Sequence, residues 1–252
     1  MYDLAVIGGG VAGIFSALTA ARHSVRAIII DSNKVGGGAT MRSAGVVTLQ
    51  LDETNDVMLV KRSIELIKEC SNDSWRVTGF LQLGRPDQLQ DSINSMRQAG
   101  VEFEVLYPSE IESKWPELIV DERFIGVYTR DDLSLEPPIF IDDCREALLD
   151  AGVEVVEGVG VDSFTIRDGK IDRAVLSDSR EVRAERYILS AGAWNREILH
   201  RHGIELMTVI ITCYAYRFDL GEDLGLLSFS DEWLHSYWRP WGTELIGGGY
   251  DA

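Results

Sequence analysis

Apolar and polar residues follow one another along the start of the chain in the order of a strand, a helix and a second strand. Residues 2–7, YDLAVI, predict a buried strand, and residues 25–30, VRAIII, predict another. Between them, residues 11–23 place apolar side chains at the spacing of one helix face: Val11, Ile14, Phe15 and Leu18. The chain therefore begins with a predicted strand–helix–strand unit.

A Gly-x-Gly-x-x-Gly pattern, at Gly8, Gly10 and Gly13, joins the first strand to the helix. The first glycine permits a tight turn, the second lets a diphosphate approach the backbone, and the third lets the helix lie close to the strand. The N–H groups at the start of the helix attract phosphate. The second strand ends at Asp31, whose carboxylate can accept hydrogen bonds from a ribose. Glycine turns also occur for packing alone, but this order of elements predicts a dinucleotide site.

A second glycine-rich segment, residues 32–48, follows where a nicotinamide-binding domain would pass into another helix and strand. Such a segment suits a longer, flavin-bearing cofactor. Four stretches together resemble the D-amino-acid oxidase family of FAD-dependent oxidoreductases, which includes glycine oxidase, sarcosine oxidase and dye-linked proline dehydrogenase subunits. They are residues 6–13, 36–47, 135–161 and 186–195. The resemblance covers nearly the whole chain.

The resemblance implies an α/β fold in which a Rossmann-like FAD-binding domain is interleaved with a mixed-sheet α+β substrate domain. We expect residues 1–74 and 131–206 to form the FAD-binding domain. Residues 75–130 and 207–252 are expected to form the substrate domain, whose second part is truncated relative to the family.

The same resemblance implies which residues contact the cofactor. The glycine turn, Asp31 and Ser32 are expected to bind the nucleotide, and the backbone of Val161 is expected to meet the adenine. A further segment is expected to run beside the pyrophosphate and the flavin, with Gly38, Ala39, Thr40, Arg42, Ser43, Ala44 and Gly45 in contact. A solvated loop charge is the competing interpretation of Arg42.

The resemblance also implies that the chain contacts the cofactor once more, at Ala191, Gly192 and Trp194. Simple packing is the competing interpretation of Trp194. Family members with covalent flavin carry His or Cys at positions where this chain has neither, and Thr40 to Ser43 do not form the usual bond. The resemblance therefore implies non-covalent FAD.

Residues 235–242, HSYWRPWG, alternate as in a strand and would place His235, Tyr237 and Arg239 on one face. A phenol and a guanidinium on one face can grip a substrate carboxylate. By its position Tyr237 resembles the tyrosine that glycine oxidase and its relatives place over the substrate. The competing interpretations are an edge-strand tyrosine and, for Arg239, an arginine that faces water.

The sequence ends with ELIGGGYDA, which resembles the family's strand just before the chain returns to the cofactor. We expect a free sheet edge after Tyr250, which a second chain would cover. Two functions stay open. One is an FAD-dependent enzyme that oxidises the C–N bond of an amino acid or secondary amine by hydride transfer to flavin. The alternative is a truncated or split-gene FAD-binding subunit that is inactive without a partner chain.

Composition and charge only exclude certain partners and types of site. The formal net charge of −17 disfavours nucleic acid and anionic lipid as partners. The cysteines and histidines lack the spacing of a metal site, so no metal is expected. No apolar run approaches the roughly 18 residues of a membrane helix, and Met1 leads directly into the first strand. We therefore expect a cytoplasmic protein without a membrane span.

Overall fold

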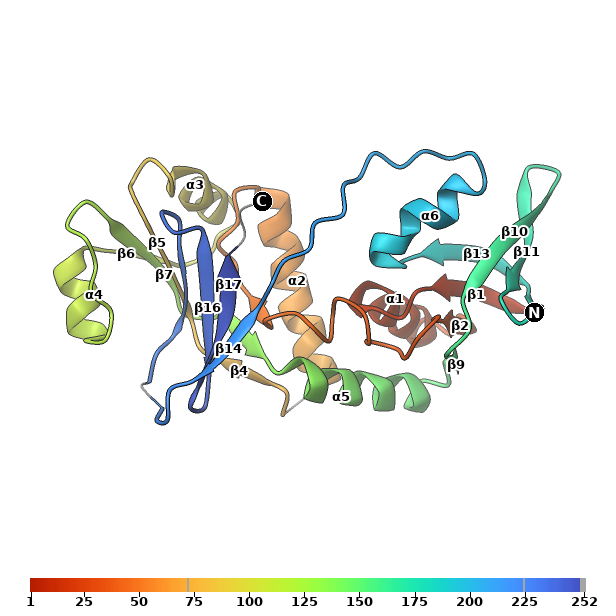
Figure 1. Cartoon of the computed structure of the whole chain (residues 1–252), viewed down its shortest axis with the longest axis horizontal. Helices are drawn as coiled ribbons and strands as arrows, with labels where there is room; N and C mark the ends of the chain where they lie inside the picture. Colours follow the sequence, from red (N-terminus) through yellow and green to blue (C-terminus); the bar gives the residue numbers. More distant parts are fainter. Residues whose placement is uncertain (72, 224, 250–252) are drawn as a thin grey trace. The chain divides into compact units, whose positions relative to one another are not determined.

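The computed structural model describes residues 1–71, 73–223 and 225–249, and the chain folds into two compact units (Figure 1). The first unit consists of Met1–Arg42 and Ile141–Ile210, and the second of Ser43–Phe140 and Ile211–Ala252. The chain therefore passes between the units after residues 42, 140 and 210. The sequence predicts boundaries at residues 75, 131 and 207 between an FAD-binding domain and a substrate domain. This functional division stays a prediction.

A parallel four-stranded sheet in the order β13-β1-β2-β9 forms the centre of the first unit. Its strands are β1 (Tyr2–Ile7), β2 (Ala27–Ile30), β9 (Glu154–Val156) and β13 (Ala184–Leu189). Helix α1 (Val11–Arg22) connects β1 to β2, and Figure 1 shows this crossover beside the sheet. The predicted strand–helix–strand unit is confirmed.

Both faces of this sheet are covered. On one face, alternate residues such as Ile7 and Ile30 pack against an antiparallel sheet formed by β10 (Val161–Arg167), β11 (Lys170–Leu176) and β12 (Glu181–Val182). Val6 and Ile29, which occupy the intervening positions, are also fully buried, and α1 packs against β1 and β2. Strands covered on both faces explain why residues 4–7 and 27–30 are continuously apolar. The first unit also contains the helices η1 (Gly192–Trp194) and α6 (Asn195–His200). Helix α5 (Pro137–Asp150) begins in the second unit and continues into the first after Phe140.

A seven-stranded mixed sheet, in the order β14-β17-β16-β15-β5-β7-β6, forms the second unit. Its strands are β5 (Phe80–Gly84), β6 (Glu104–Leu106), β7 (Ile125–Thr129), β14 (Tyr216–Asp219), β15 (Ser228–Asp231), β16 (Ser236–Trp241) and β17 (Glu244–Gly249). Between the described strands of this sheet, β5 and β15 pair in parallel and the other pairs are antiparallel. A smaller sheet contains β3 (Val46–Val47), β4 (Trp75–Val77) and β8 (Leu133–Leu135), and the helices are α2 (Thr54–Cys70), α3 (Gln90–Gln98) and α4 (Pro108–Lys114).

The free sheet edge expected after Tyr250 falls outside the described residues, but the strand just before it, β17, is not an edge of the sheet. Strand β17 pairs with β16 on one side and with β14 on the other, so it lies inside the sheet. The edges of the sheet are β14 and β6. The neighbouring strand is supplied by residues 216–219, whose pairing with β17 the sequence pattern did not reveal. Residues 250–252 lie outside the described residues.

A buried carboxylate organises the loop that follows β3. Asp132 is 1% exposed and accepts hydrogen bonds from the Thr129 hydroxyl (2.6 Å), the Thr48 hydroxyl (2.8 Å) and the Leu49 N–H (3.2 Å). The amide of Gln50 extends the network by donating to the backbone carbonyls of β5 and β7 at 2.9 and 3.1 Å. Burial raises the pKa of Asp132 to about 6, against the opposing effect of the three donors.

This carboxyl group should make the fold less stable as the pH rises. Its pKa in the folded chain lies above the ordinary value of 3.8, so the folded state binds the proton more tightly than the unfolded state. Between pH 4 and pH 7 the group should cost up to about 3 kcal/mol of unfolding free energy. In urea unfolding, Asp132→Asn should remove that loss, whereas Asp131→Asn, at an exposed neighbour, should keep it. The same pH dependence in wild type and Asp132→Asn would contradict this.

Candidate functional site

Two of the three pattern glycines are required by the packing of the chain itself. Gly8 has a φ of +98°, and an added Cβ would lie 2.5 Å from the carbonyl oxygen of Ser190. A Cβ at Gly13 would lie 2.0 Å from the carbonyl oxygen of Gly8, so helix α1 starts almost in contact with the end of β1. These contacts agree with the tight turn and the close helix approach expected of the two positions.

Gly10 differs, because no contact in the described part of the chain requires it to be glycine. It caps α1 with φ −70° and ψ 179°, a conformation open to any residue, and the atom nearest to an added Cβ is the Thr40 hydroxyl oxygen at 3.5 Å. The first N–H groups of a helix have no partner within the helix. One of them, the N–H of Val11, donates to the Thr40 hydroxyl at 3.1 Å. The turn thus presents backbone donors beside open space, which fits a diphosphate.

Asp31 connects the end of β2 to the glycine turn. Its two carboxylate oxygens accept hydrogen bonds from the N–H of Gly9 (2.7 Å) and of Asn33 (2.8 Å). Each carboxylate oxygen can accept a second hydrogen bond, so a ribose hydroxyl remains an admissible partner. Sequence reasoning proposed only the ribose contact; the structure adds a role in holding the turn.

The second glycine-rich segment folds back onto the first. The N–H of Gly36 donates to the Gly9 carbonyl at 2.8 Å, and the Thr40 hydroxyl lies at the start of α1 as described. Among the described residues other than its two chain neighbours, none has an atom within 4 Å of a Cβ added at Gly38, and Ala39 and Arg42 are exposed. The predicted contact residues from 38 to 42 therefore form an open loop beside the glycine turn.

An ion pair that sequence reasoning missed supports this loop. Glu157 accepts the N–H of Val35 at 2.7 Å, and both of its oxygens bind the guanidinium of Arg145, with Oε2 at 3.1 Å. Arg145 lowers the pKa of Glu157, so the carboxylate stays charged. Arg145 lies in α5, and Glu157 directly follows β9. No short sequence motif relates either residue to Val35.

Other predicted cofactor residues of the first unit surround the same strand ends. Ala191 lies against Gly8, where an added Cβ would meet its Cα at 2.6 Å. Gly192 and Trp194 follow in η1, and Trp194 is 54% exposed, so it does not belong to the packed core. Ser32 is exposed close to Gly160, and the neighbouring Val161 begins β10 with its side chain in the core.

Three predicted contact residues fall in the second unit instead. Ser43 is exposed, whereas Ala44 and Gly45 are buried. Gly45 has a φ of +73°, and a Cβ there would lie 2.1 Å from the Leu135 carbonyl oxygen. The close pairing with the chain at β8 thus requires glycine at position 45.

Tyr237 and Arg239 lie on one face of β16, as predicted, but in different surroundings. Strand β16 lies between β15 and β17, so the edge-strand interpretation of Tyr237 is wrong. Its side chain is half-buried, and burial raises the pKa of its phenol. His235 precedes the strand with a φ of +47°, so the predicted alternation does not extend to it.

The guanidinium of Arg239 does not face water, because the side chain is fully buried. Its Nε donates to the Ala44 carbonyl, and its Nη2 lies 3.3 Å from a carboxylate oxygen of Glu136. Burial lowers the pKa of Arg239, and Glu136 opposes that shift. The interpretation as a solvated strand arginine is therefore wrong. The sequence pattern did not reveal this, because Glu136, the partner of Arg239, lies 103 positions away.

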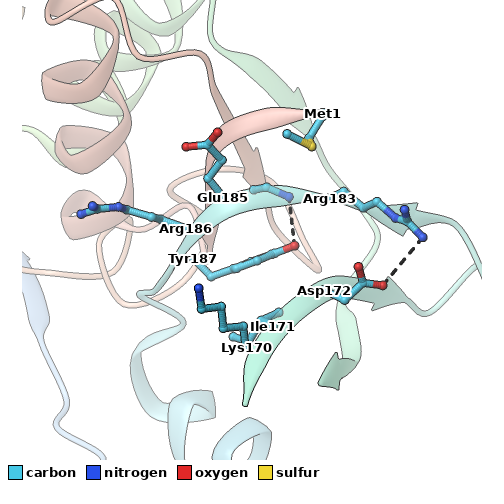
Figure 2. A pocket seen from close by; sticks show the side chains of 9 residues that line it. Met1, Lys170, Ile171, Asp172, Arg183, Glu185, Arg186 and Tyr187 are labelled. Carbon is cyan, nitrogen blue, oxygen red and sulfur yellow. Dashed lines mark hydrogen bonds and ion pairs between the residues drawn. The ribbon is translucent and has the colours of Figure 1, made fainter. Parts of the chain in front are cut away.

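A pocket in the first unit, of about 630 Å³, lies apart from these residues (Figure 2). It is lined by Met1, the start of β11 and residues 183–187, where Arg183 is 3.7 Å from Asp172. This is the amino end of β1 and β13, whereas ligands of parallel sheets bind at the carboxyl ends of the strands. Among the described residues, no group of three or more potential metal ligands occurs and no helix is long and apolar enough to cross a membrane.

The parallel sheet, glycine turn and terminal acid define a Rossmann-like dinucleotide-binding unit. A family model described as FAD dependent oxidoreductase (DAO) matches residues 3–252, and the chain belongs to this family. L-proline dehydrogenase from P. horikoshii superposes with a TM-score of 0.87 at 22% identity, over 99% of this chain and 70% of that chain. Glycine oxidase from Geobacillus kaustophilus gives 0.81 at 20%, over 100% and 71%. The predicted family, fold class and FAD dependence are confirmed.

Curated relatives are longer than this chain. Mitochondrial sarcosine dehydrogenase of Mus musculus is 22% identical over 266 residues, which cover 99% of this chain and 29% of that protein. Monomeric sarcosine oxidase of Arthrobacter sp. (strain TE1826) is 24% identical over 217 residues, which cover 81% of this chain and 55% of the oxidase. The chain thus spans less than a third of the first protein and about half of the second.

The glycine geometry predicts that two alanine substitutions change the stability of the apo protein by different amounts. Gly13→Ala should reduce the unfolding free energy by about 3 kcal/mol, because its methyl group would overlap a backbone carbonyl. Gly10→Ala should change it by no more than about 1 kcal/mol, since the space is open and only the preference for the helix cap changes. Urea unfolding of both variants without added cofactor measures the difference. Equal losses in the two variants would contradict it.

Proposed function

We propose that this chain binds FAD without a covalent bond and serves the oxidation of the C–N bond of an amino acid or secondary amine. The observation that carries the cofactor site is the open space at Gly10, at the start of a helix whose other two pattern glycines are explained by packing. A glycine that the protein does not need is expected where a ligand approaches the backbone.

In this proposal each group of residues meets a different part of the cofactor. The start of α1 holds the diphosphate, Asp31 accepts from a ribose hydroxyl, and the backbone at Val161 faces the adenine. Residues 38–45, together with 191–194, lie along the rest of the molecule. No His or Cys occurs in residues 38–45, which supports a non-covalent site.

FAD, when bound, accepts a hydride from a carbon that bears nitrogen. The chain's own task is then to orient the substrate and exclude water. Tyr237 is the residue that we assign to the substrate, because its side chain is only half-buried and it lies on the same face of β16 as Arg239. Its hydroxyl would donate to a substrate carboxylate.

The substrate class rests on the relatives, whose names include sarcosine dehydrogenase, sarcosine oxidase, glycine oxidase and L-proline dehydrogenase. All of these names denote amino acids, and sarcosine and proline are secondary amines. We propose a small molecule of this kind as the substrate and the cytoplasm as the place of action. The alternative of a subunit that needs a partner chain for activity stays a prediction.

Binding of FAD is the first test. The purified chain should bind FAD in an equilibrium titration, and Gly10→Ala should weaken binding by about tenfold or more, because a methyl group would occupy the space of the diphosphate. Acid precipitation should leave the flavin in the supernatant. Flavin in the pellet would contradict the non-covalent site, and unchanged affinity in Gly10→Ala would contradict the diphosphate position.

Substrate use tests Tyr237. Among amino acids and secondary amines that reduce the bound flavin anaerobically, Tyr237→Phe should lower kcat/KM by the value of one hydrogen bond, about 0.5–1.5 kcal/mol. The FAD dissociation constant should not change. Tyr107→Phe, at an exposed tyrosine, serves as the control. Identical kcat/KM in wild type and Tyr237→Phe would remove Tyr237 from the site, and no flavin reduction by any compound would favour the subunit alternative.

A further inference from the structure

Among the described residues of the second unit, Arg239 is the largest side chain that is completely buried. Its Nη2 lies 3.3 Å from Oε2 of Glu136, and the other oxygen of this carboxylate lies 3.0 Å from Arg217. Arg217 also reaches Glu244 at 2.8 Å, on the neighbouring strand β17. One carboxylate therefore joins two arginines of different character, since the Arg217 side chain is 48% exposed and the Arg239 side chain is 0% exposed.

Stability alone does not explain a buried arginine at this position. When an ion pair is buried, the free energy lost with its hydration is about as large as the free energy gained from the attraction of its charges. Apolar residues of similar size often stabilise a fold more. The guanidinium is also incompletely satisfied, because its Nη1 is buried without a hydrogen-bond partner in the described part of the chain. A methionine would fill the same space without either cost.

What distinguishes Arg239 from Arg217 is its contact with the backbone at position 44. Its Nε donates to the Ala44 carbonyl, while the next carbonyl, of Gly45, accepts the N–H of Leu135 at 2.7 Å. Leu135 directly precedes Glu136, the carboxylate that holds Arg239, and the N–H of Glu136 is itself bound to Ser74 at 2.9 Å. Two successive carbonyls are thus held from two sides by one connected group of residues.

These two carbonyls belong to the segment at which the chain enters the second unit after Arg42. The segment is also the one expected to run beside the flavin. We infer that Arg239, held by Glu136, is a positioning residue that fixes the Ala44–Gly45 backbone for the bound flavin. The inference rests on the proposed function. It replaces the expectation that Arg239 grips the substrate carboxylate.

Two matched substitutions separate this role from a merely structural one. Arg239→Met removes the donor to Ala44, whereas Arg217→Met removes the other arginine from the same carboxylate and leaves that donor in place. In the apo protein, Arg239→Met should speed hydrogen exchange of the amides of Leu135 and residues 44–47 by about tenfold, as expected for loss of a hydrogen bond from a charged donor. Arg217→Met should change it by less than about twofold, the range of an exposed ion pair.

The consequence for the cofactor is measured separately. Arg239→Met should raise the FAD dissociation constant by about tenfold and shift the visible spectrum of the bound flavin, while Arg217→Met leaves both near wild type. If Arg239→Met does not fold, the double variant Arg239→Met/Glu136→Gln removes the stranded carboxylate charge and takes its place.

The outcomes distinguish the inference from the function on which it rests. Unchanged exchange in Arg239→Met overturns the inference, as does faster exchange with unchanged FAD affinity and spectrum. An equal response of the two methionine variants also overturns it, because the contact with Ala44 would then be irrelevant. A wild-type chain that binds no FAD overturns the proposed function itself. Faster exchange together with weaker binding, in Arg239→Met alone, supports the inference.

Discussion

The start of helix α1 lies so close to the end of β1 that no side chain fits between them. An added Cβ at Gly13 would come within 2.0 Å of the Gly8 carbonyl oxygen, and the hydroxyl of Ser190 donates to that same oxygen at 2.8 Å. This contact brings the first turn of the helix, with its N–H groups, directly over the carboxyl ends of the parallel strands. The loop after β2 then closes against the turn through Gly36 and Asp31.

Glycines serve two separate purposes in this arrangement. Gly8, Gly13 and Gly45 allow backbone segments to approach one another, and a side chain at any of them would overlap a carbonyl oxygen. Gly10 and Gly38 meet no such obstacle, and both lie in the loops that surround the start of α1. A glycine pattern in a sequence therefore mixes positions that the packing of the chain requires with positions beside open space, and only the distances in the structure distinguish them.

The second unit depends on polar groups that are expensive to bury. Asp132 is surrounded by three donors and Gln50 reaches two strands at once, so the loop after β3 has little freedom. Arg239 and Glu136 hold the preceding backbone in the same manner. Buried polar groups with nearly all partners present favour one arrangement, because each displaced donor or acceptor would lose its hydrogen bond without regaining water. Such segments suit a site that must keep its shape.

The local elements of the first unit follow from the sequence alone. Continuous apolar runs identified β1 and β2, and helical spacing identified α1, because these signals depend on neighbours within a few residues. The glycine pattern with Asp31 predicts a nucleotide site on the same local grounds. The partners of Arg239, the interior position of β17 and the support of Val35 by Glu157 could not be foreseen. Arg239 and Glu136 are about 100 positions apart in the sequence, and Val35 and Glu157 are further apart still. Strand β17 is covered by β14, from which a long connection separates it. Local periodicity shows that a residue belongs to a strand, but burial and pairing depend on which distant segments meet it, and only the tertiary structure decided that.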